Sequence, residues 1–157
     1  MNIEKLMSTK LAVCHPHDSL STAAQLMWEH DCGSVLVVDD DEAIVGIITD
    51  RDICMAGYIR GRALHTISIS DTMSNQVFSC SADDSLETAG QRMADNQVRR
   101  LPILDSENRP IGVLSLNDIA RYGASSELGG GLDHEVAQTL AAISQPWSER
   151  RLESLSA

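Results

Sequence analysis

The chain contains an internal repeat at an offset of 66 residues, and the repeat runs without a gap. When residues 7–54 are laid over residues 73–120, 14 of the 48 positions are identical, and many others hold similar side chains. A repeat of this length is one supersecondary unit used twice. We expect the two units to pack about a pseudo-twofold axis and to form two related clefts. A binding site in one cleft should therefore have a counterpart in the other.

The length of 157 residues suits one domain or one closely packed pair. Each repeat alone is near the size at which a hydrophobic core becomes marginal, so the two should share buried surface. Aromatic residues make up only 3% of the chain, which leaves a core of aliphatic residues and methionine. The formal net charge of −11 opposes non-specific binding to nucleic acid, but it leaves room for a small anion in a local basic pocket.

The targeting and redox signals are few. No segment reaches the roughly 18 apolar residues of a membrane span, and the N-terminus has no signal-peptide core, so we expect a cytoplasmic protein without a membrane partner. The four cysteines have no Cys-x-x-Cys spacing, and we expect them to be reduced. Cys14 and Cys80 occupy equivalent positions, which indicates a packing role for both.

Hydrophobic periodicity predicts the same five elements in each repeat. In the first they are a strand at 11–14, a helix at 19–31 capped by Asp18 or Ser19 and ended by Gly33, hairpin strands at 35–38 and 44–48, and a helix from residue 49. In the second they are a strand at 77–80, a helix through 86–93, hairpin strands at 101–104 and 111–114, and a helix from residue 115. The order β-α-β-β-α predicts an α+β fold, with a three-stranded mixed sheet and both helices on one face in each repeat.

We assign residues 1–60 and 73–122 to the two repeats and 61–72 to a linker. Residues 123–131 are rich in Gly and Ser and predict a flexible connection. An amphipathic helix from Asp133 to Ser144 should follow, with Pro146 stopping it and a loose tail beyond. This extra C-terminal helix lies outside the duplication. Its apolar face must be buried on the repeats or on a second chain.

One pattern occurs twice, each time after a predicted hairpin: Gly, two apolar residues, Thr or Ser, two further residues, Asp and an apolar residue. It begins at Gly46 and again at Gly112, and the second hairpin is preceded by Arg99-Arg100. In this pattern and in element order, residues 1–122 resemble a tandem pair of CBS domains, the repeats named after cystathionine beta-synthase, as found in stand-alone bacterial proteins.

The resemblance implies a non-catalytic regulatory module that forms a homodimer and signals to an effector protein. It also implies binding of adenosine nucleotides, such as AMP, ADP, ATP, NAD or S-adenosylmethionine, in the two clefts. We expect AMP or ATP as the regulatory ligand and no cofactor. The sequence contains no P-loop, no Gly-x-Gly-x-x-Gly pattern and no Ser-His-Asp grouping, so an enzyme is not expected.

The paired motifs Thr49-x-x-Asp52 and Ser115-x-x-Asp118 have two interpretations. A carboxylate can accept hydrogen bonds from both hydroxyls of a ribose, while the hydroxyl residue lies at a helix N-terminus that favours phosphate. The same spacing is also a capping box, which stabilises a helix without any ligand. Two copies in matching contexts favour ligand binding, and the two roles are compatible.

The resemblance places the adenine between the first and second strands of a repeat. This implies contacts from Val13, Cys14 and Val35 in the first repeat and from Ser79, Cys80 and Leu101 in the second. The same residues can instead be core residues. His15 lies on the loop after the first strand, where it is a candidate phosphate contact.

Arg99 and Arg100 are candidate phosphate ligands, because a guanidinium binds phosphate bidentately. Their counterparts in the first repeat are Gly33 and Ser34, so the two clefts should differ. The cleft that receives the arginines should bind polyphosphates better. The alternative is a surface ion pair with Glu107 or Asp95, which would contribute little.

Two other functions remain open. The chain could be a ligand-independent dimerisation module, an interpretation favoured by the acidic turn from Asp39 to Glu42 if it lies near a cleft. It could also be a small redox or metal-binding protein using Cys14, His15 and His17. Only three such ligands are close in sequence, which makes a metal site the weaker hypothesis.

Overall fold

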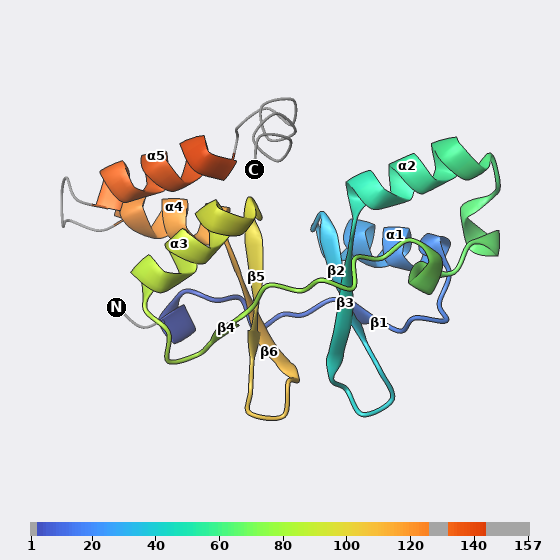
Figure 1. The fold of residues 1–157 in the computed structure, drawn as a ribbon, viewed down its shortest axis with the longest axis horizontal. Coiled ribbons are helices and arrows are strands. Elements are labelled where there is room, and N and C mark those ends of the chain that lie inside the picture. The colour runs from blue at the N-terminus through green and yellow to red at the C-terminus, as the bar shows by residue number, and fades with distance from the viewer. Residues whose placement is uncertain (1–2, 126–131, 144–157) are drawn as a thin grey trace, which may run out of the picture.

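The computed structural model describes residues 3–125 and 132–143. Two three-stranded sheets lie at the centre of the molecule, and the helices lie on the outer sides (Figure 1). Repeat one contains β1 (Val13–Cys14), α1 (Leu20–Glu29), β2 (Ser34–Val38), β3 (Ile44–Thr49) and α2 (Asp50–Arg60). Repeat two contains β4 (Cys80–Ser81), α3 (Leu86–Asn96), β5 (Arg100–Leu104), β6 (Pro110–Ser115) and α4 (Leu116–Ser125). Three short 3-10 turns, η1 (Ile3–Lys5), η2 (Leu64–Thr66) and η3 (Ile69–Asp71), and the final helix α5 (Leu132–Ile143) complete the order.

The two sheets have the same topology. In each, the first strand pairs in parallel with the second, and the second pairs antiparallel with the third. The predicted α+β fold, with two mixed three-stranded sheets in β-α-β-β-α order, is confirmed. Successive residues of a strand face opposite sides of the sheet. Val35 and Val37 of β2 therefore pack in the core of repeat one, and Leu101 and Ile103 of β5 pack in that of repeat two.

The helix ends follow local side-chain chemistry. Ser19 caps α1 by accepting a hydrogen bond from Thr22 N at 3.2 Å, and Ser85 caps α3 in the same way from Thr88 N at 3.1 Å. The helix α1 ends earlier than predicted, because Asp31 rather than Gly33 takes the left-handed conformation (φ 49°) after it. Asp is one of the few residues that adopt this conformation without large strain. Residues 123–125, predicted to begin a flexible connection, form the last turn of α4, and the rest of that connection lies outside the described residues.

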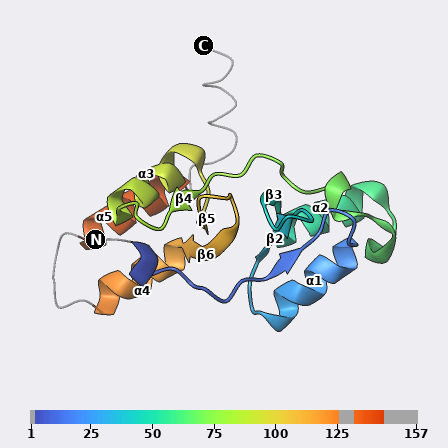
Figure 2. The same cartoon turned by 90° about the horizontal axis from the view of Figure 1, so that it is seen from below.

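The N-terminal segment of each unit packs on the other repeat. Residues 3–8 run along repeat two, where Ile3 is fully buried and Ser8 bridges to β6. Residues 69–74 run along repeat one, where Ile69 is fully buried and Ser74 bridges to β3. We call these two stretches the exchanged segments. From each of them the chain crosses to the repeat whose sequence it begins (Figure 2). The exchange makes the two cores parts of one structure.

Two glycines make room for the exchanged segments. A Cβ atom on Gly46 of β3 would lie 2.7 Å from Met73 Sδ and 3.0 Å from the Ser74 carbonyl oxygen. A Cβ atom on Gly112 of β6 would collide with Met7 Sδ. Both glycines are part of the repeated pattern, which indicates that the pattern partly encodes this packing.

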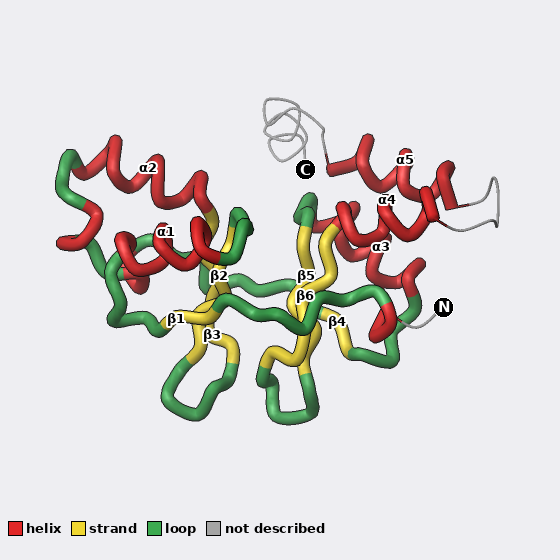
Figure 3. The backbone as a smooth tube through the Cα atoms, turned by 180° about the vertical axis from the view of Figure 1, so that it is seen from behind, coloured by secondary structure: helices red, strands yellow, loops and turns green. Residues whose placement is uncertain are grey.

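The helix α5 covers the outer face of repeat two. It packs against α3 and α4, and its Ile143 joins the core of that repeat (Figure 3). Val136 and Ile143 of its apolar face thus pack on the same chain, one of the two outcomes expected from the sequence, whereas Leu140 is 47% exposed. Pro146 and the tail after it lie outside the described residues. Within the described ranges, no helix combines the length and the apolar character needed to cross a membrane.

Candidate nucleotide clefts

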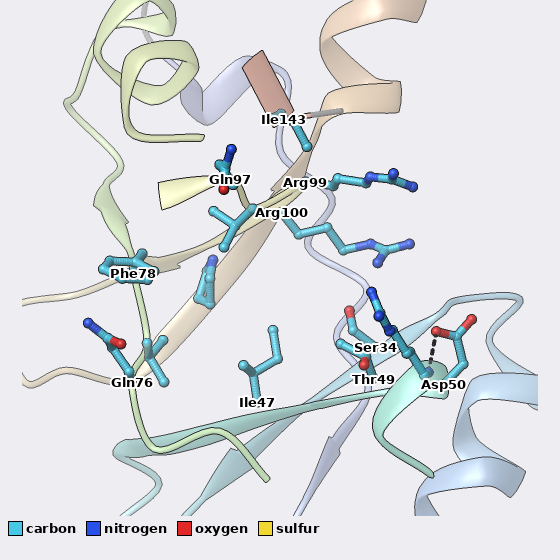
Figure 4. Close-up of a pocket in the computed structure, with 14 residues that line it drawn as sticks. Ser34, Ile47, Thr49, Asp50, Gln76, Phe78, Gln97, Arg99, Arg100 and Ile143 are labelled. Carbon is cyan, nitrogen blue, oxygen red and sulfur yellow. Dashed lines mark hydrogen bonds between the residues drawn. The ribbon is translucent and has the colours of Figure 1, made fainter. Parts of the chain in front are cut away.

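A cavity of about 610 Å³, which we call cleft A, lies between the two repeats. It combines the start of α2 in repeat one with the segments that precede β4 and β5 in repeat two, and the end of α5 closes it (Figure 4). The lining residues are Ser34, Ile47, Thr49, Asp50, Arg51, Gln76, Val77, Phe78, Gln97, Val98, Arg99, Arg100, Pro102 and Ile143.

A second cavity of about 380 Å³, cleft B, has the reciprocal composition. It combines the start of α4 in repeat two with the segments that precede β1 and β2 in repeat one. The lining residues are Ser8, Lys10, Leu11, Ala12, His30, Asp31, Cys32, Ser34, Leu36, Arg100, Val113, Ser115, Asn117, Asp118 and Arg121. Most of them are counterparts of cleft A residues at the 66-residue offset. The predicted pair of related clefts is therefore present.

Each cleft crosses between the repeats, which the sequence did not indicate. The motif with Thr49 faces the strands of repeat two, and the motif with Ser115 faces those of repeat one. Strand alternation selects the lining. Arg100 and Pro102 of β5 face the clefts, whereas Leu101 between them is fully buried in the core.

The residues expected around the adenine do not line cleft A or cleft B. Cys14, Val35, Cys80 and Leu101 are buried in the two cores, because they face the helices and not the other repeat. Val13 is 42% exposed, and neither Val13 nor Ser79 is among the residues that line cleft A or cleft B. The His15 ring also lies outside both clefts, with Nδ1 3.1 Å from the Val38 carbonyl oxygen.

Both Thr/Ser-x-x-Asp motifs form capping boxes. Thr49 N donates to Asp52 Oδ2 at 2.9 Å, Thr49 Oγ1 donates to the same oxygen at 2.7 Å, and Asp52 N donates back to Thr49 Oγ1 at 3.2 Å. Ser115 and Asp118 repeat these bonds at 2.8, 2.5 and 3.2 Å. The capping interpretation is thus confirmed for both copies.

The two motifs differ in their access to a ligand. Asp118 lines cleft B, and its second carboxylate oxygen accepts from Arg121. Asp52 does not line cleft A, where the neighbouring Asp50 takes its place. Asp50 Oδ1 accepts from Arg51 N at 2.8 Å, so the first turn of α2 is already satisfied by the chain itself. An anion in cleft A must therefore be held mainly by side chains.

Three arginines line cleft A, and two of them, Arg99 and Arg100, are the predicted phosphate ligands. Arg51, Arg99 and Arg100 make no hydrogen bond or ion pair through their guanidinium groups with the described residues. The expected alternative partners are occupied, since Glu107 pairs with Arg109 at 3.0 Å and Asp95 accepts from Gln91 at 2.6 Å.

The remaining arginines of the described ranges all have partners. Arg60, Arg92, Arg109 and Arg121 form ion pairs, and Arg62 donates to the Thr66 carbonyl oxygen at 2.6 Å. In a chain with 23 acidic residues and 12 basic ones, three unpaired guanidinium groups in one cleft are unlike the rest of the surface. They give the cleft a local positive charge suited to an anion.

Cleft A also has an apolar side. The guanidinium groups of Arg99 and Arg100 extend toward Thr49 and Asp50, while Phe78 lies on the opposite side of the cavity (Figure 4). Phe78 is the only phenylalanine in the chain, and Val77, Val98 and Ile143 line the cavity with it. Phe78 and Gln76 were not predicted, although a lone aromatic residue beside a strand in an aromatic-poor chain was an available signal.

The two equivalent thiols, Cys14 and Cys80, are unsuited to nucleophilic or redox chemistry. Burial, together with the negative charge of Asp18, raises the pKa of Cys14 to about 12. Burial also raises the pKa of Cys80, although the nearby Arg92 opposes that shift. Only the thiolate is a nucleophile or a metal ligand, and Cys14 stays protonated at neutral pH. In the part of the chain that the structure describes, no group of three or more His, Cys, Asp or Glu side chains could hold a metal ion.

The chain is similar to several known proteins. A family model described as CBS domain matches residues 3–58 and 69–125. The CBS domain-containing protein YhcV of Bacillus subtilis is 36% identical over 129 residues, which cover 82% of this chain and 90% of that protein. Hypoxic response protein 1 of Mycobacterium tuberculosis is 30% identical over 141 residues, which cover 90% of this chain and 92% of that one.

Solved structures share the fold. The crystal structure of Hypoxic Response Protein I, with two coordinated zinc ions, has a TM-score of 0.69 and 30% identity, and the match covers 78% of this chain and 98% of that one. The CBS domain pair of protein MJ0100, solved in complex with 5′-methylthioadenosine and S-adenosyl-L-methionine, has a TM-score of 0.71 at 23% identity, covering 78% and 98%.

Proposed function

Because the chain belongs to the CBS domain family and is a tandem CBS pair, a regulatory module and not an enzyme, we propose that it is a cytoplasmic sensor of adenosine nucleotides. The observation that carries this proposal is the set of three unpaired arginines in cleft A. Such a set costs stability through mutual repulsion unless an anion compensates it. The nucleotide phosphates provide that anion.

The two sides of cleft A fit the two ends of a nucleotide. The adenine stacks on Phe78 among the apolar residues, and the phosphates reach Arg51, Arg99 and Arg100 on the other side. The volume of about 610 Å³ is in the range of small-molecule sites. Since cleft A holds more unpaired cations than cleft B, we assign it the higher affinity for a polyphosphate such as ATP, while cleft B suits AMP.

The fold itself tolerates such ligands in another protein. MJ0100 holds two adenosine compounds in its CBS pair, and its identity to this chain is low enough that the likeness concerns the fold alone. The choice of nucleotide must therefore come from the residues of this chain. In cleft B those residues include Asp118, which can accept from a ribose hydroxyl if Arg121 moves aside.

Thermal unfolding in the presence of nucleotides tests the proposal. AMP, ADP, ATP, NAD and S-adenosylmethionine are each added at millimolar concentration, and the midpoint temperature is compared with that of the free protein. A ligand at a hundred times its Kd should raise the midpoint by about 5 °C or more. The shift with ATP should be smaller in an Arg99→Ala, Arg51→Ala double variant, which keeps only cleft B intact, and unchanged in an Arg62→Ala control. No shift with any of the compounds would refute the proposal.

We also propose that output passes through a homodimer formed by the outer face of repeat one. Trp28 of α1 is 85% exposed, and Tyr58 and Ile59 of α2 are 82% and 73% exposed. The groove between these helices, about 600 Å³, is open, whereas α5 packs on the corresponding helices in repeat two. Apolar residues such as Met27 and Ile53 line it together with the charged Asp31, Asp50 and Arg100. Large exposed apolar side chains mark interaction sites.

The occupant we assign is the same face of a second copy. The described residues of each chain form one open helical face, so pairing two such faces about a twofold axis covers both of them. Light scattering after size exclusion should give a dimer for the natural chain and a monomer for Trp28→Glu. Leu140→Glu, which alters an exposed apolar residue on the covered repeat, is the control and should stay dimeric. A monomeric natural chain would refute the dimer and leave nucleotide binding unaffected.

A further inference from the structure

Two equivalent residues lie where the clefts meet. Ser34 at the start of β2 and Arg100 at the start of β5 are counterparts at the 66-residue offset. Each of them lines both cleft A and cleft B. They therefore flank the pseudo-twofold axis that relates the two cavities. One of the pair carries a positive charge and the other is neutral, so a single guanidinium serves this central position.

Arg100 is placed to reach either cleft, and it also lines the groove between α1 and α2. Its guanidinium has no hydrogen bond or ion pair with residues 3–125 or 132–143 that would hold it on one side. It passes close to Gly33, where an added Cβ would lie 3.4 Å from Arg100 Nη2 and 3.0 Å from Asp50 Oδ2. The absence of a side chain at Gly33 leaves space for the guanidinium beside the α2 start.

We infer that Arg100 is shared by the two clefts and makes them compete for anionic ligands. This inference rests on the proposed nucleotide binding. A guanidinium that forms a bidentate pair with a phosphate in one cleft is no longer available to a phosphate in the other. The coupling is reciprocal, since a ligand that weakens its neighbour is weakened by it to the same degree.

The two clefts are unequal competitors. Without Arg100, cleft A still has the unpaired Arg51 and Arg99. Without Arg100, cleft B keeps Lys10, while its Arg121 is engaged by Asp118. When Arg100 binds a ligand in cleft A, cleft B therefore loses a larger share of its positive charge than cleft A would lose in the opposite case. Filling cleft A should lower the affinity of cleft B, and a high nucleotide concentration is needed to fill both.

A matched pair of variants separates the clefts. Arg51 and Asn117 are counterparts at the exposed starts of α2 and α4, and each lines only one of the two clefts. Arg51→Glu blocks cleft A with a negative charge, and Asn117→Glu does the same for cleft B. Calorimetric titration of Arg51→Glu with ATP gives the affinity of cleft B when Arg100 is available to it. Titration of the natural chain gives the affinity of cleft B after cleft A is filled.

We expect ATP to bind cleft B about tenfold or more weakly in the natural chain than in Arg51→Glu, the size of one charged hydrogen-bond pair. In the Arg100→Ser background, which makes position 100 match position 34, this difference should disappear. The natural chain could also bind only one ATP. If Arg51→Glu then still binds one ATP, in cleft B, the inference is supported. If Arg51→Glu binds none, the inference is overturned.

Three outcomes separate the possible failures. Equal affinities of cleft B in the natural chain and in Arg51→Glu would overturn the sharing of Arg100 and leave nucleotide binding intact. A difference that persists in the Arg100→Ser background would assign the antagonism to repulsion between the two nucleotides, which also overturns the inference. Absence of any ATP binding to the natural chain would instead refute the proposed function itself.

Discussion

The outer faces of the two repeats differ far more than their interiors. In repeat two, α5 packs over α3 and α4 and adds Ile143 to the core. In repeat one, the corresponding face of α1 and α2 is open and carries Trp28 and Tyr58, where repeat two has Ala94 and Ala124. One chain thus shows two ways to complete the same unit, with a helix of its own or with another molecule.

The interiors of the two repeats are matched at most positions. Most buried residues of one core have buried counterparts at the 66-residue offset in the other, for example Ile3 and Ile69, Cys14 and Cys80, Leu20 and Leu86, Met27 and Met93, and Ile53 and Ile119. At the clefts the same offset pairs arginines with uncharged residues, Arg99 with Gly33 and Arg100 with Ser34. Packing constrains the core equally in both copies, while the cleft positions are free to differ in charge.

The largest effect on stability should come from shortening Ile143, the side chain by which α5 enters the core of repeat two. Ile143 is almost fully buried against repeat two, and we expect Ile143→Ala to lower the free energy of unfolding by about 2–5 kcal/mol, because it leaves a cavity. Trp28→Ala on the open face should change it by less than about 0.5 kcal/mol under conditions where the chain is monomeric. Urea denaturation of both variants measures the contrast. Equal losses would mean that the two outer faces are equally covered.

The next largest effect on stability should come from adding a side chain to Gly46 or Gly112, which lie beneath the exchanged segments. In Gly46→Ala the new Cβ meets both Met73 Sδ and the Ser74 carbonyl oxygen, and the backbone atom cannot move aside easily. We expect a loss of about 1–3 kcal/mol, typical of an overpacked site. Gly112→Ala meets only the flexible Met7 side chain, so its loss should be smaller. A larger loss for Gly112→Ala, measured by denaturation, would contradict this ranking.

The capping boxes should separate stability from binding. Asp52→Ala and Asp118→Ala each remove a cap and should lower the free energy of unfolding by about 1 kcal/mol. Only Asp118 lines a cleft, so Asp118→Ala should also weaken nucleotide binding in cleft B, by about 2 kcal/mol. Calorimetric titration distinguishes the two variants. An equal loss of affinity in both would show that Asp52 reaches the ligand as well.

Thiol reactivity should show the smallest and most local difference. Cys54 on the open face of repeat one is exposed, whereas Cys14 and Cys80 are buried with raised pKa values. A disulfide reagent at pH 8 should therefore modify Cys54 within minutes and leave Cys14 and Cys80 unmodified until the chain unfolds. Protection of Cys54 at high protein concentration would support the dimer, since Cys54 lines the groove between α1 and α2.

Linkage gives the pH dependence of the buried thiol. The pKa of Cys14 is raised from 9.0 to about 12 in the folded chain, so between these values the unfolded chain binds fewer protons. The free energy of unfolding should therefore be unaffected by this group below pH 9 and should fall as the pH rises from 9 toward 12. The fall should be smaller in Cys14→Ser. An identical alkaline profile for the two chains would contradict the raised pKa.

Local patterns predicted the elements well, because each was specified within a few residues. Ser19 and Ser85 begin helices as capping residues, and the apolar runs around Val35 and Leu101 form the central strands. The hydroxyl-x-x-Asp spacing gave the caps at Thr49 and Ser115 as one of two interpretations, because a capping box spans only four residues, although ligand binding was favoured.

The make-up of each cleft could not be predicted in the same way. The sequence does not say whether the start of α2 faces the strands of its own repeat or those of its twin, because two similar units offer similar surfaces. The structure pairs Thr49 with the segment before β4, and this brings Phe78 and Gln76 into the cleft. The alternation of side chains along a strand could have been used at the sequence level. It would have favoured Ser34 and Pro102 over Val35 and Leu101 as cleft residues.

The exchanged segments have a consequence for how the chain folds. Residues 3–8 complete repeat two, and Ser8 pairs with Val113, which is synthesised long after it. Residues 3–8 therefore leave the ribosome well before their native partners in β6, and repeat one must await residues 69–74 before its own core closes. Neither repeat holds a complete core within its own contiguous stretch. The duplicated sequence should consequently unfold in a single cooperative transition, with no state in which one repeat is folded and the other is not.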